Sequence, residues 1–122
     1  MNIKIAKKEI IHFIGIGGIG MSGLALIMKG QGFKVQGSDI SNNININRLK
    51  KEKIKIYLDQ SKKNLKNATI VVISSAIKKT NSELVEAKRK KIPIIKRGEM
   101  LASIVSLMKN IVVVGSHGKT TT

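Results

Sequence analysis

The sequence predicts an α/β domain with a doubly wound, mainly parallel sheet of about five strands. Two observations lead to this prediction. Short runs rich in β-branched residues alternate along the chain with stretches that carry apolar residues at helical spacing, and the glycine-rich stretch "GIGGIGMSG" joins the first run to the first helical stretch. At 122 residues, the chain is long enough for one domain with its own core.

The first part of the chain predicts a strand, a helix and a second strand. "EIIHFIGI" from residue 9 and "FKVQGSD" from residue 33 are apolar runs bounded by glycine. Residues 21–29 lie between them and have the dense apolar pattern of a buried helix. Together these segments predict a βαβ unit.

Three further strands and three further helices are predicted after this unit. "IKIYL" from Ile54, "ATIVVISSA" from Ala68 and "IPIIK" from Ile92 are runs of the kind that a parallel sheet buries on both faces. Helices are expected at 47–53, 82–91 and 98–108, and either Asn81 or Ser82 can cap the second of these.

The pattern restarts near residue 109. There "IVVV" at 111–114 predicts a fresh strand, which a second glycine-rich run follows at once. We therefore expect two units, one over residues 1–108 and the start of another over residues 109–122.

The composition narrows the class of protein. The net charge of +16 favours nucleic acid as a partner, but the lysines are spread evenly, and arginine and aromatic side chains are few, so no nucleic-acid partner is expected. The chain has no cysteine, which excludes disulfides and thiolate metal sites. The start "MNIKIAKKEI" has neither the apolar core of a signal peptide nor the length of a membrane span. We expect a cytoplasmic protein without membrane insertion.

The first glycine-rich stretch has the features of a phosphate-binding loop. Gly15, Gly17 and Gly20 fit the spacing G-x-G-x-x-G of Rossmann-like domains, where the helix that follows presents backbone N–H groups to an anion. Asp39 ends the second predicted strand, where an acidic residue meets ribose hydroxyls. By itself this pattern favours an NAD(P)-binding domain of an oxidoreductase, or tight packing of the helix with no ligand.

The second glycine-rich run, "GSHGKTTT" from Gly115, is a short form of the P-loop. The strict pattern needs glycine five residues before Gly118, and Val113 stands there. The remaining residues still predict an ATP site, in which Lys119 neutralises phosphate oxygens and the Thr120 hydroxyl coordinates Mg²⁺.

These stretches resemble one family closely. "HFIGIGGIGMSGLA", "GSDI", "VVISSAI", "IPIIKRGEMLA" and "GSHGKTTT" occur in the order and spacing of the bacterial UDP-N-acetylmuramate–L-alanine ligases, over almost the whole chain. The resemblance implies a carboxylate–amine ligase of peptidoglycan precursor synthesis with ATP and Mg²⁺ as cofactors. Its substrates would be UDP-N-acetylmuramate, which is phosphorylated on its carboxylate, and L-alanine, which displaces phosphate from the acyl phosphate.

The resemblance also implies the roles of the two units and of their residues. Residues 1–108 would form a Rossmann-like domain that binds the UDP-sugar, and residues 109–122 would start the ATP-binding domain. The UDP-sugar site would comprise Gly15, Gly17, Gly18, Gly20, Met21, Ser22, Gly23, Ser38, Asp39, Ser74, Ser75 and Ala76. The ATP site would comprise Gly115, Ser116, His117, Gly118, Lys119, Thr120 and Thr121, with Lys119 catalytic and Thr120 on the metal.

Three positions stand apart from this assignment. Gln60 occupies a place where many relatives have histidine, and the frequent motif N-P-E reads Asn81, Ser82, Glu83. His12 is expected to be a packed or hydrogen-bonded strand residue and not a catalyst. The NAD(P)-binding domain remains the alternative.

Overall fold

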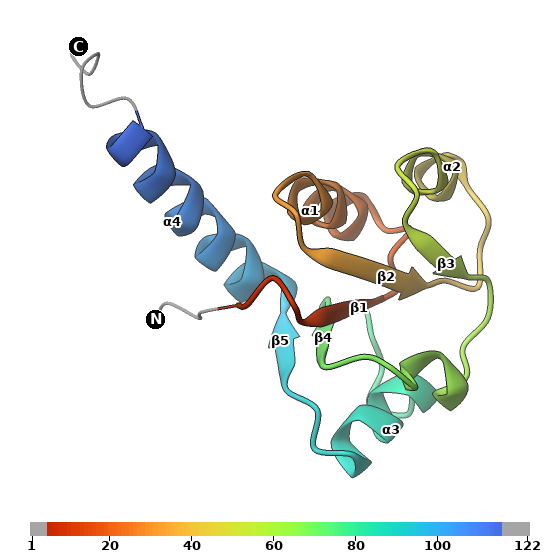
Figure 1. Ribbon diagram of the computed structural model, residues 1–122. Coiled ribbons are helices and arrows are strands. Elements are labelled where there is room, and N and C mark those ends of the chain that lie inside the picture. Colours follow the sequence, from red (N-terminus) through yellow and green to blue (C-terminus); the bar gives the residue numbers. More distant parts are fainter. Residues whose placement is uncertain (1–4, 116–122) are drawn as a thin grey trace.

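The computed structural model describes the backbone of residues 5–115 and the side chains of residues 5–108. Its sheet has the strand order β3-β2-β1-β4-β5, and every neighbouring pair is parallel (Figure 1). The strands are β1 (Ile10–Ile14), β2 (Lys34–Ser38), β3 (Lys55–Tyr57), β4 (Ile70–Ile73) and β5 (Ile94–Lys96). From β1 the chain adds β2 and then β3 on one side of the sheet. It then crosses to the other side of β1, where it adds β4 and β5. The doubly wound α/β class is confirmed, and its switch point lies between β1 and β4.

The helices form a layer on each face of the sheet. They are α1 (Ile19–Gly30), α2 (Ile44–Lys51), α3 (Ser82–Arg89) and α4 (Arg97–Gly115), with a short 3₁₀ helix η1 (Lys62–Leu65) that the sequence did not predict. Figure 1 shows α1 and α2 on one face and α3 on the opposite face. Right-handed crossovers in the two directions from β1 produce this division. The amino-terminal half of α4 packs against the face of α1.

Two apolar cores, one on each face of the sheet, pack the helices against the strands. Ile11 and Phe13 of β1 face the core beneath α1, α2 and α4, whereas Ile14 faces the smaller core beneath α3 and η1. Val72 and Val71 of β4 divide between the same two cores. The prediction that β-branched runs are buried on both faces is confirmed for β4, because consecutive side chains of a strand point to opposite faces and Ile70, Val71 and Val72 are all buried. The edge strands β3 and β5 are only partly buried, since each has a neighbouring strand on one side only.

The last helix differs from the sequence prediction. The helix predicted at 98–108 starts at Arg97 and continues to Gly115, so the strand predicted at 111–114 is wrong in this structure. A strand needs a neighbour for its backbone N–H and C=O groups, and the described residues place no strand beside 111–114. A helix satisfies the same groups within itself.

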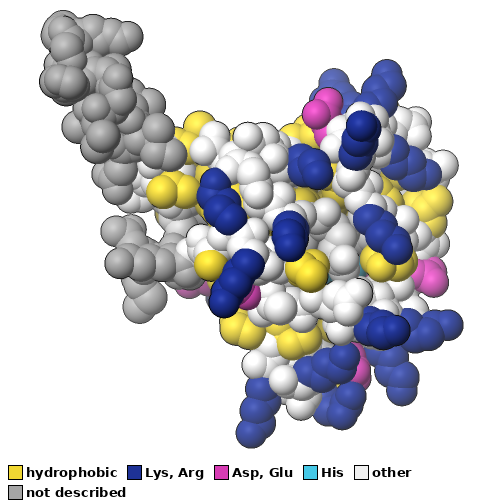
Figure 2. Space-filling model, viewed as in Figure 1, with side chains coloured by type: hydrophobic (Ala, Val, Ile, Leu, Met, Phe, Trp, Pro, Cys, Tyr) yellow, Lys and Arg dark blue, Asp and Glu magenta, His cyan; other side chains and the backbone are white. Residues whose placement is uncertain are grey.

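The surface agrees with the charge pattern of the sequence. Figure 2 shows Lys and Arg side chains scattered over the visible face, with neutral and apolar surface between them. Across residues 5–115, no helix combines the length and apolar character that crossing a membrane requires.

Candidate functional site

The first glycine-rich stretch forms a tight turn that rests on the end of β2. Gly15 adopts a φ of +76°, which a side chain would disfavour, and turns the chain out of β1. The N–H groups of Gly15 and Ile16 both donate to the carbonyl of Ser38, at 2.8 and 2.9 Å. The Gly18 N–H donates back to the Gly15 carbonyl at 3.1 Å. The turn is thus fixed by β2 before the helix begins.

The backbone of Gly17 is in contact with the carboxylate of Asp39. The Gly17 N–H donates to Asp39 Oδ2 at 2.8 Å, and a Cβ atom at position 17 would lie 2.7 Å from the same oxygen. Asp39 Oδ1 accepts the Ser41 N–H at 3.0 Å. The absent side chain of Gly17 therefore makes room for Asp39, which ties the turn to the loop after β2.

The first turn of α1 is open to an anion. Gly18 is the N-cap, no side chain caps the helix, and the first turn has no acidic residue. Within the described part of the chain, no acceptor is found for the N–H groups of Ile19, Gly20 and Met21. Unpaired N–H groups and the helix dipole make such an end favourable for negative charge.

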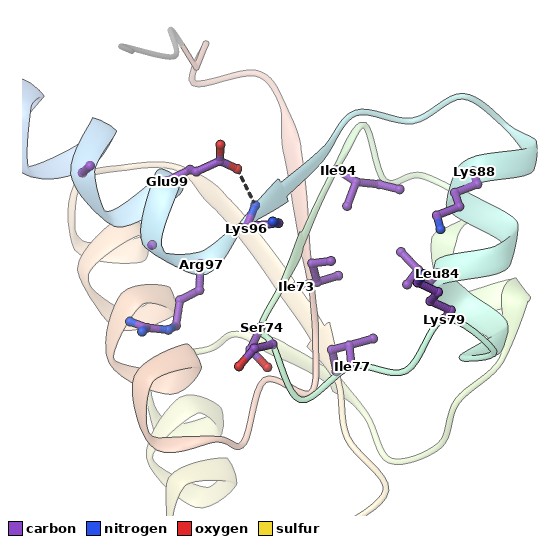
Figure 3. Close-up of a pocket in the computed structure, with 13 residues that line it drawn as sticks. Ile73, Ser74, Ile77, Lys79, Leu84, Lys88, Ile94, Lys96, Arg97 and Glu99 are labelled. Atoms are coloured by element: carbon purple, nitrogen blue, oxygen red, sulfur yellow. Dashed lines mark hydrogen bonds between the residues drawn. The ribbon is translucent and has the colours of Figure 1, made fainter.

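Arg97 brings a cation to this helix end. It is the first residue of α4, directly after β5, and a Cβ atom at Gly20 would lie 3.1 Å from its Cδ and Nε atoms. Figure 3 shows the side chain extending from α4 toward α1. Arg97 is not among the site residues predicted from the sequence. Its signal in the sequence is a basic residue that immediately follows a predicted strand, in the stretch "IPIIKRGEMLA".

A cavity of about 880 Å³ adjoins the turn at the carboxyl ends of β4 and β5. Figure 3 shows its apolar side chains over these strands and α3, with Ser74 and Arg97 toward α1. Its lining consists of Ile73, Ser74, Ser75, Ile77, Lys79, Leu84, Lys88, Ile94, Lys96, Arg97, Gly98, Glu99 and Ala102. Four of these side chains are cationic and one is acidic, so the cavity favours an anionic ligand with an apolar part. Ile77 Cδ1 would lie 3.2 Å from a Cβ atom at Gly15, so the cavity adjoins the turn.

The predicted UDP-sugar residues divide into two groups in the structure. Gly15, Gly17, Gly18, Gly20, Asp39, Ser74, Ser75 and Ala76 all follow the carboxyl ends of strands, at one edge of the sheet. The Ser74 hydroxyl accepts the Ala76 N–H at 3.3 Å, while Ser75 and Ala76 are exposed. These residues are near the open first turn of α1, at the switch point, where an open α/β sheet places its ligands.

The other predicted residues point elsewhere. Met21 is buried in the core beneath α1, and Gly23 lies on the exposed side of α1 with nothing within 4 Å of its Cβ position. The Ser22 hydroxyl is buried and donates to the Ile19 carbonyl at 3.1 Å. The Ser38 hydroxyl is fully buried and donates to Glu83 Oε1 at 2.6 Å. The hydroxyl groups of Ser22 and Ser38 are thus bonded inside the protein.

His12 is a buried strand residue, as the sequence predicted. It is 0% exposed, and its Nε2 atom lies 2.6 Å from Glu83 Oε1 on α3. Burial raises the pKa of the Glu83 carboxyl, but hydrogen bonds from His12, Ser38 and Asn64 outweigh burial and hold that pKa below its usual value. Glu83 is therefore ionised at neutral pH inside the α3 layer.

The predicted ATP site falls mostly outside the described residues. Gly115 is the last residue of α4, and Ser116, His117, Gly118, Lys119, Thr120 and Thr121 lie beyond the part of the chain that the structure describes. Among residues 5–108, no group of three or more His, Asp or Glu side chains is arranged to hold a metal ion.

Comparison with known proteins identifies the family. Residues 10–109 match the Mur ligase family, in the part described as its catalytic domain. The chain belongs to the Mur ligase family. The UDP-N-acetylmuramate–L-alanine ligase of Pelagibacter ubique is 73% identical to this Mur ligase chain over all 122 residues, and that of Rickettsia prowazekii is 58% identical over 112 residues. The chain covers 26% and 23% of these two proteins, so it spans about a quarter of their length.

Solved structures of Mur ligases share the fold. The UDP-N-acetylmuramate–alanine ligase of Thermotoga maritima matches with a TM-score of 0.72 and 35% identity, over 83% of this chain and 23% of that one. A UDP-N-acetylmuramate:L-alanyl-γ-D-glutamyl-meso-diaminopimelate ligase from Neisseria matches with a TM-score of 0.69 and 30% identity, over 73% of this chain and 28% of that one. The family resemblance of the sequence motifs is thereby confirmed.

Proposed function

We propose that this chain binds the UDP part of UDP-N-acetylmuramate within an ATP-dependent ligase that adds L-alanine to that sugar nucleotide. One observation carries the proposal. The open first turn of α1 and the guanidinium of Arg97 meet at the switch point of the sheet, beside a cavity with cationic side chains. The relatives named above support it, because both are named as ligases of UDP-N-acetylmuramate and L-alanine.

The diphosphate would bind at the first turn of α1. The N–H groups of Ile19, Gly20 and Met21 supply donors there, and Arg97 supplies a charge that offsets the negative phosphates. The Gly17 N–H is already bonded to Asp39, so it holds the turn in shape and is not a donor to the ligand in this arrangement. Asp39 would lie beside the uridine, at the end of β2.

The sugar would extend from the turn toward the cavity. Ser74, Ser75 and Ala76 follow β4 at the edge of that cavity, where their backbone and hydroxyl groups supply hydrogen bonds to sugar oxygens. The apolar floor beneath them would contact carbon atoms of the ligand.

Formation of the acyl phosphate would need ATP and Mg²⁺. We assign residues 1–108 to UDP-sugar binding and residues 109–122 to the start of the ATP-binding domain, with the loop Gly115–Thr121 on the phosphates. Lys119 would stabilise charge on the transferred phosphoryl group, and Thr120 would coordinate Mg²⁺. L-alanine would then displace phosphate from the acyl phosphate, as part of peptidoglycan precursor synthesis in the cytoplasm.

Titration calorimetry on the 122-residue chain tests the proposal. We expect saturable binding of UDP and UDP-N-acetylmuramate, both tighter than binding of NADH, because the site holds a sugar nucleotide. Preferential binding of NADH would overturn the assignment and favour the dinucleotide-binding alternative.

A further inference from the structure

A buried polar network lies beneath α3, on the face of the sheet opposite α1. At its centre is the carboxylate of Glu83, which is 0% exposed. Oε1 accepts hydrogen bonds from His12 Nε2 and Ser38 Oγ, both at 2.6 Å. Oε2 accepts from Asn64 Nδ2 at 2.7 Å and from the Ser61 N–H at 3.2 Å. A buried carboxylate is tolerated only when it is hydrogen-bonded in this way.

The orientation of His12 is fixed by its other neighbour. Gln36 Nε2 lies 3.0 Å from the Asn64 carbonyl and 2.9 Å from His12 Nδ1. A carbonyl oxygen only accepts, so the Gln36 amide must present its N–H groups on this side. His12 Nδ1 therefore accepts from Gln36, and the ring hydrogen is on Nε2, where it points at Glu83.

Ser38 connects this network to the glycine-rich turn of the candidate site, at the carboxyl ends of the strands. Its hydroxyl donates to Glu83, while its carbonyl accepts the N–H groups of Gly15 and Ile16 at 2.8 and 2.9 Å. One residue at the end of β2 thus joins the buried carboxylate to the turn that precedes α1. Asn81 fixes the other end of the connection, because its side chain accepts the Glu83 N–H at 2.9 Å and so holds the start of α3.

We propose that Glu83 is a positioning residue for the nucleotide site. Through Ser38, it holds the Gly15–Gly18 turn in the conformation that leaves the first N–H groups of α1 open to a phosphate. Glu83 does not touch the ligand in this arrangement, since it lies beneath α3. The inference rests on the proposed function in one respect, namely that a UDP nucleotide binds at α1.

A purely structural role predicts a different outcome. Apolar side chains of similar volume often stabilise a core as well as a buried charge does. If Glu83 only stabilised α3, its replacement would lower the free energy of unfolding but leave the folded turn unchanged. A positioning role requires that the turn itself changes in molecules that are still folded.

Glu83→Gln and Glu86→Gln form a matched pair on the same helix. Glu86 is also buried, pairs with Arg89 and Lys90 on α3, and makes no contact with Ser38 among the described residues. In the 122-residue chain, we expect Glu83→Gln to weaken UDP binding about tenfold, because a hydrogen bond to a charged group is lost from the support of the turn. Hydrogen exchange at the amides of Gly15 and Ile16 should become faster, and the ¹⁵N shifts of the His12 ring should change. Glu86→Gln should leave all three readouts at their original values.

Ser38→Ala is the second variant and removes only the hydroxyl that joins Glu83 to β2. It should also speed exchange at Gly15 and Ile16, even if Glu83→Gln does not fold. Melting temperatures identify the conditions under which each variant is folded. Unchanged exchange and unchanged UDP affinity in the folded variants would overturn the inference. If the original chain does not bind UDP at all, the proposed function fails, whereas the exchange rates at Gly15 and Ile16 still decide the positioning role.

Discussion

At the scale of single residues, the glycines of this chain meet different physical requirements. Gly15 provides a positive φ, whereas Gly17 makes room for the Asp39 carboxylate. Gly37 is the most crowded, since a Cβ atom there would lie 2.5 Å from Ile16 Cδ1 and 2.8 Å from the Phe13 carbonyl. Gly37 lies in β2 opposite Phe13 of the central strand. The Ile16 side chain can pack over the start of the turn only because position 37 has no side chain.

We expect Gly37→Ala to destabilise the fold by about 1–3 kcal/mol, the usual range for an added methyl group in a packed core. Gly23→Ala is the control, because nothing lies within 4 Å of its Cβ position on α1. There alanine should stabilise by about 0.5–1 kcal/mol through its higher helix propensity. Urea denaturation monitored by circular dichroism measures both. Equal shifts of the two midpoints would contradict the crowding at Gly37.

The same residues show what the sequence could predict. The spacing of Gly15, Gly17 and Gly20 located the turn correctly, because a G-x-G-x-x-G pattern between a strand and a helix has one common geometry. The spacing did not predict that the Asp39 carboxylate accepts a hydrogen bond from the Gly17 N–H, or that Arg97 lies against Gly20. Both contacts depend on how segments far apart in the chain fold together.

At the scale of elements, alternation of apolar runs predicted every strand of the sheet and all four helices. The end of α4 was not predicted, because "IVVV" has a high strand propensity and only tertiary neighbours decide between strand and helix. The sequence also left two candidates for the cap of α3. The structure selects Asn81, whose side chain accepts the N–H groups of Glu83 and Leu84 at 2.9 and 3.1 Å.

The cap yields an element-scale prediction. Asn81→Ala should lower the free energy of unfolding by about 1 kcal/mol, since it removes the acceptor for two otherwise unpaired N–H groups. Ser82→Ala should have little effect, because Ser82 is exposed in the first turn and does not cap the helix. Thermal melts of the two variants give the comparison. A Ser82→Ala chain that is the less stable of the two would show that the cap is assigned to the wrong residue.

At the scale of the whole molecule, the candidate site joins the two halves of the doubly wound sheet. The turn and α1 belong to the half that contains β1, β2 and β3, whereas Ser74, the cavity and Arg97 belong to the half that contains β4 and β5. Neither half of the sheet contains both the open first turn of α1 and the guanidinium of Arg97. The net charge of +16 surrounds this site with a diffuse positive field, which by itself attracts any polyanion.

The contribution of Arg97 can be separated from that field. Arg97→Gln should weaken UDP binding about tenfold, because the cation beside the phosphates is lost. Lys34→Gln removes the same charge from the first residue of β2, at the amino ends of the strands and away from the candidate site. This change should leave the affinity for UDP nearly unchanged.

Calorimetric titrations with UDP at about 0.05 and 0.5 M NaCl provide the measurement, since salt screens distant charges more than adjacent ones. We expect the tenfold gap between the Arg97→Gln and Lys34→Gln chains to persist at the higher salt concentration, because a contact with phosphate lies well within the screening distance. A gap that closes with salt would mean that the nucleotide responds to total charge. In that case the guanidinium beside Gly20 would not be part of the binding site.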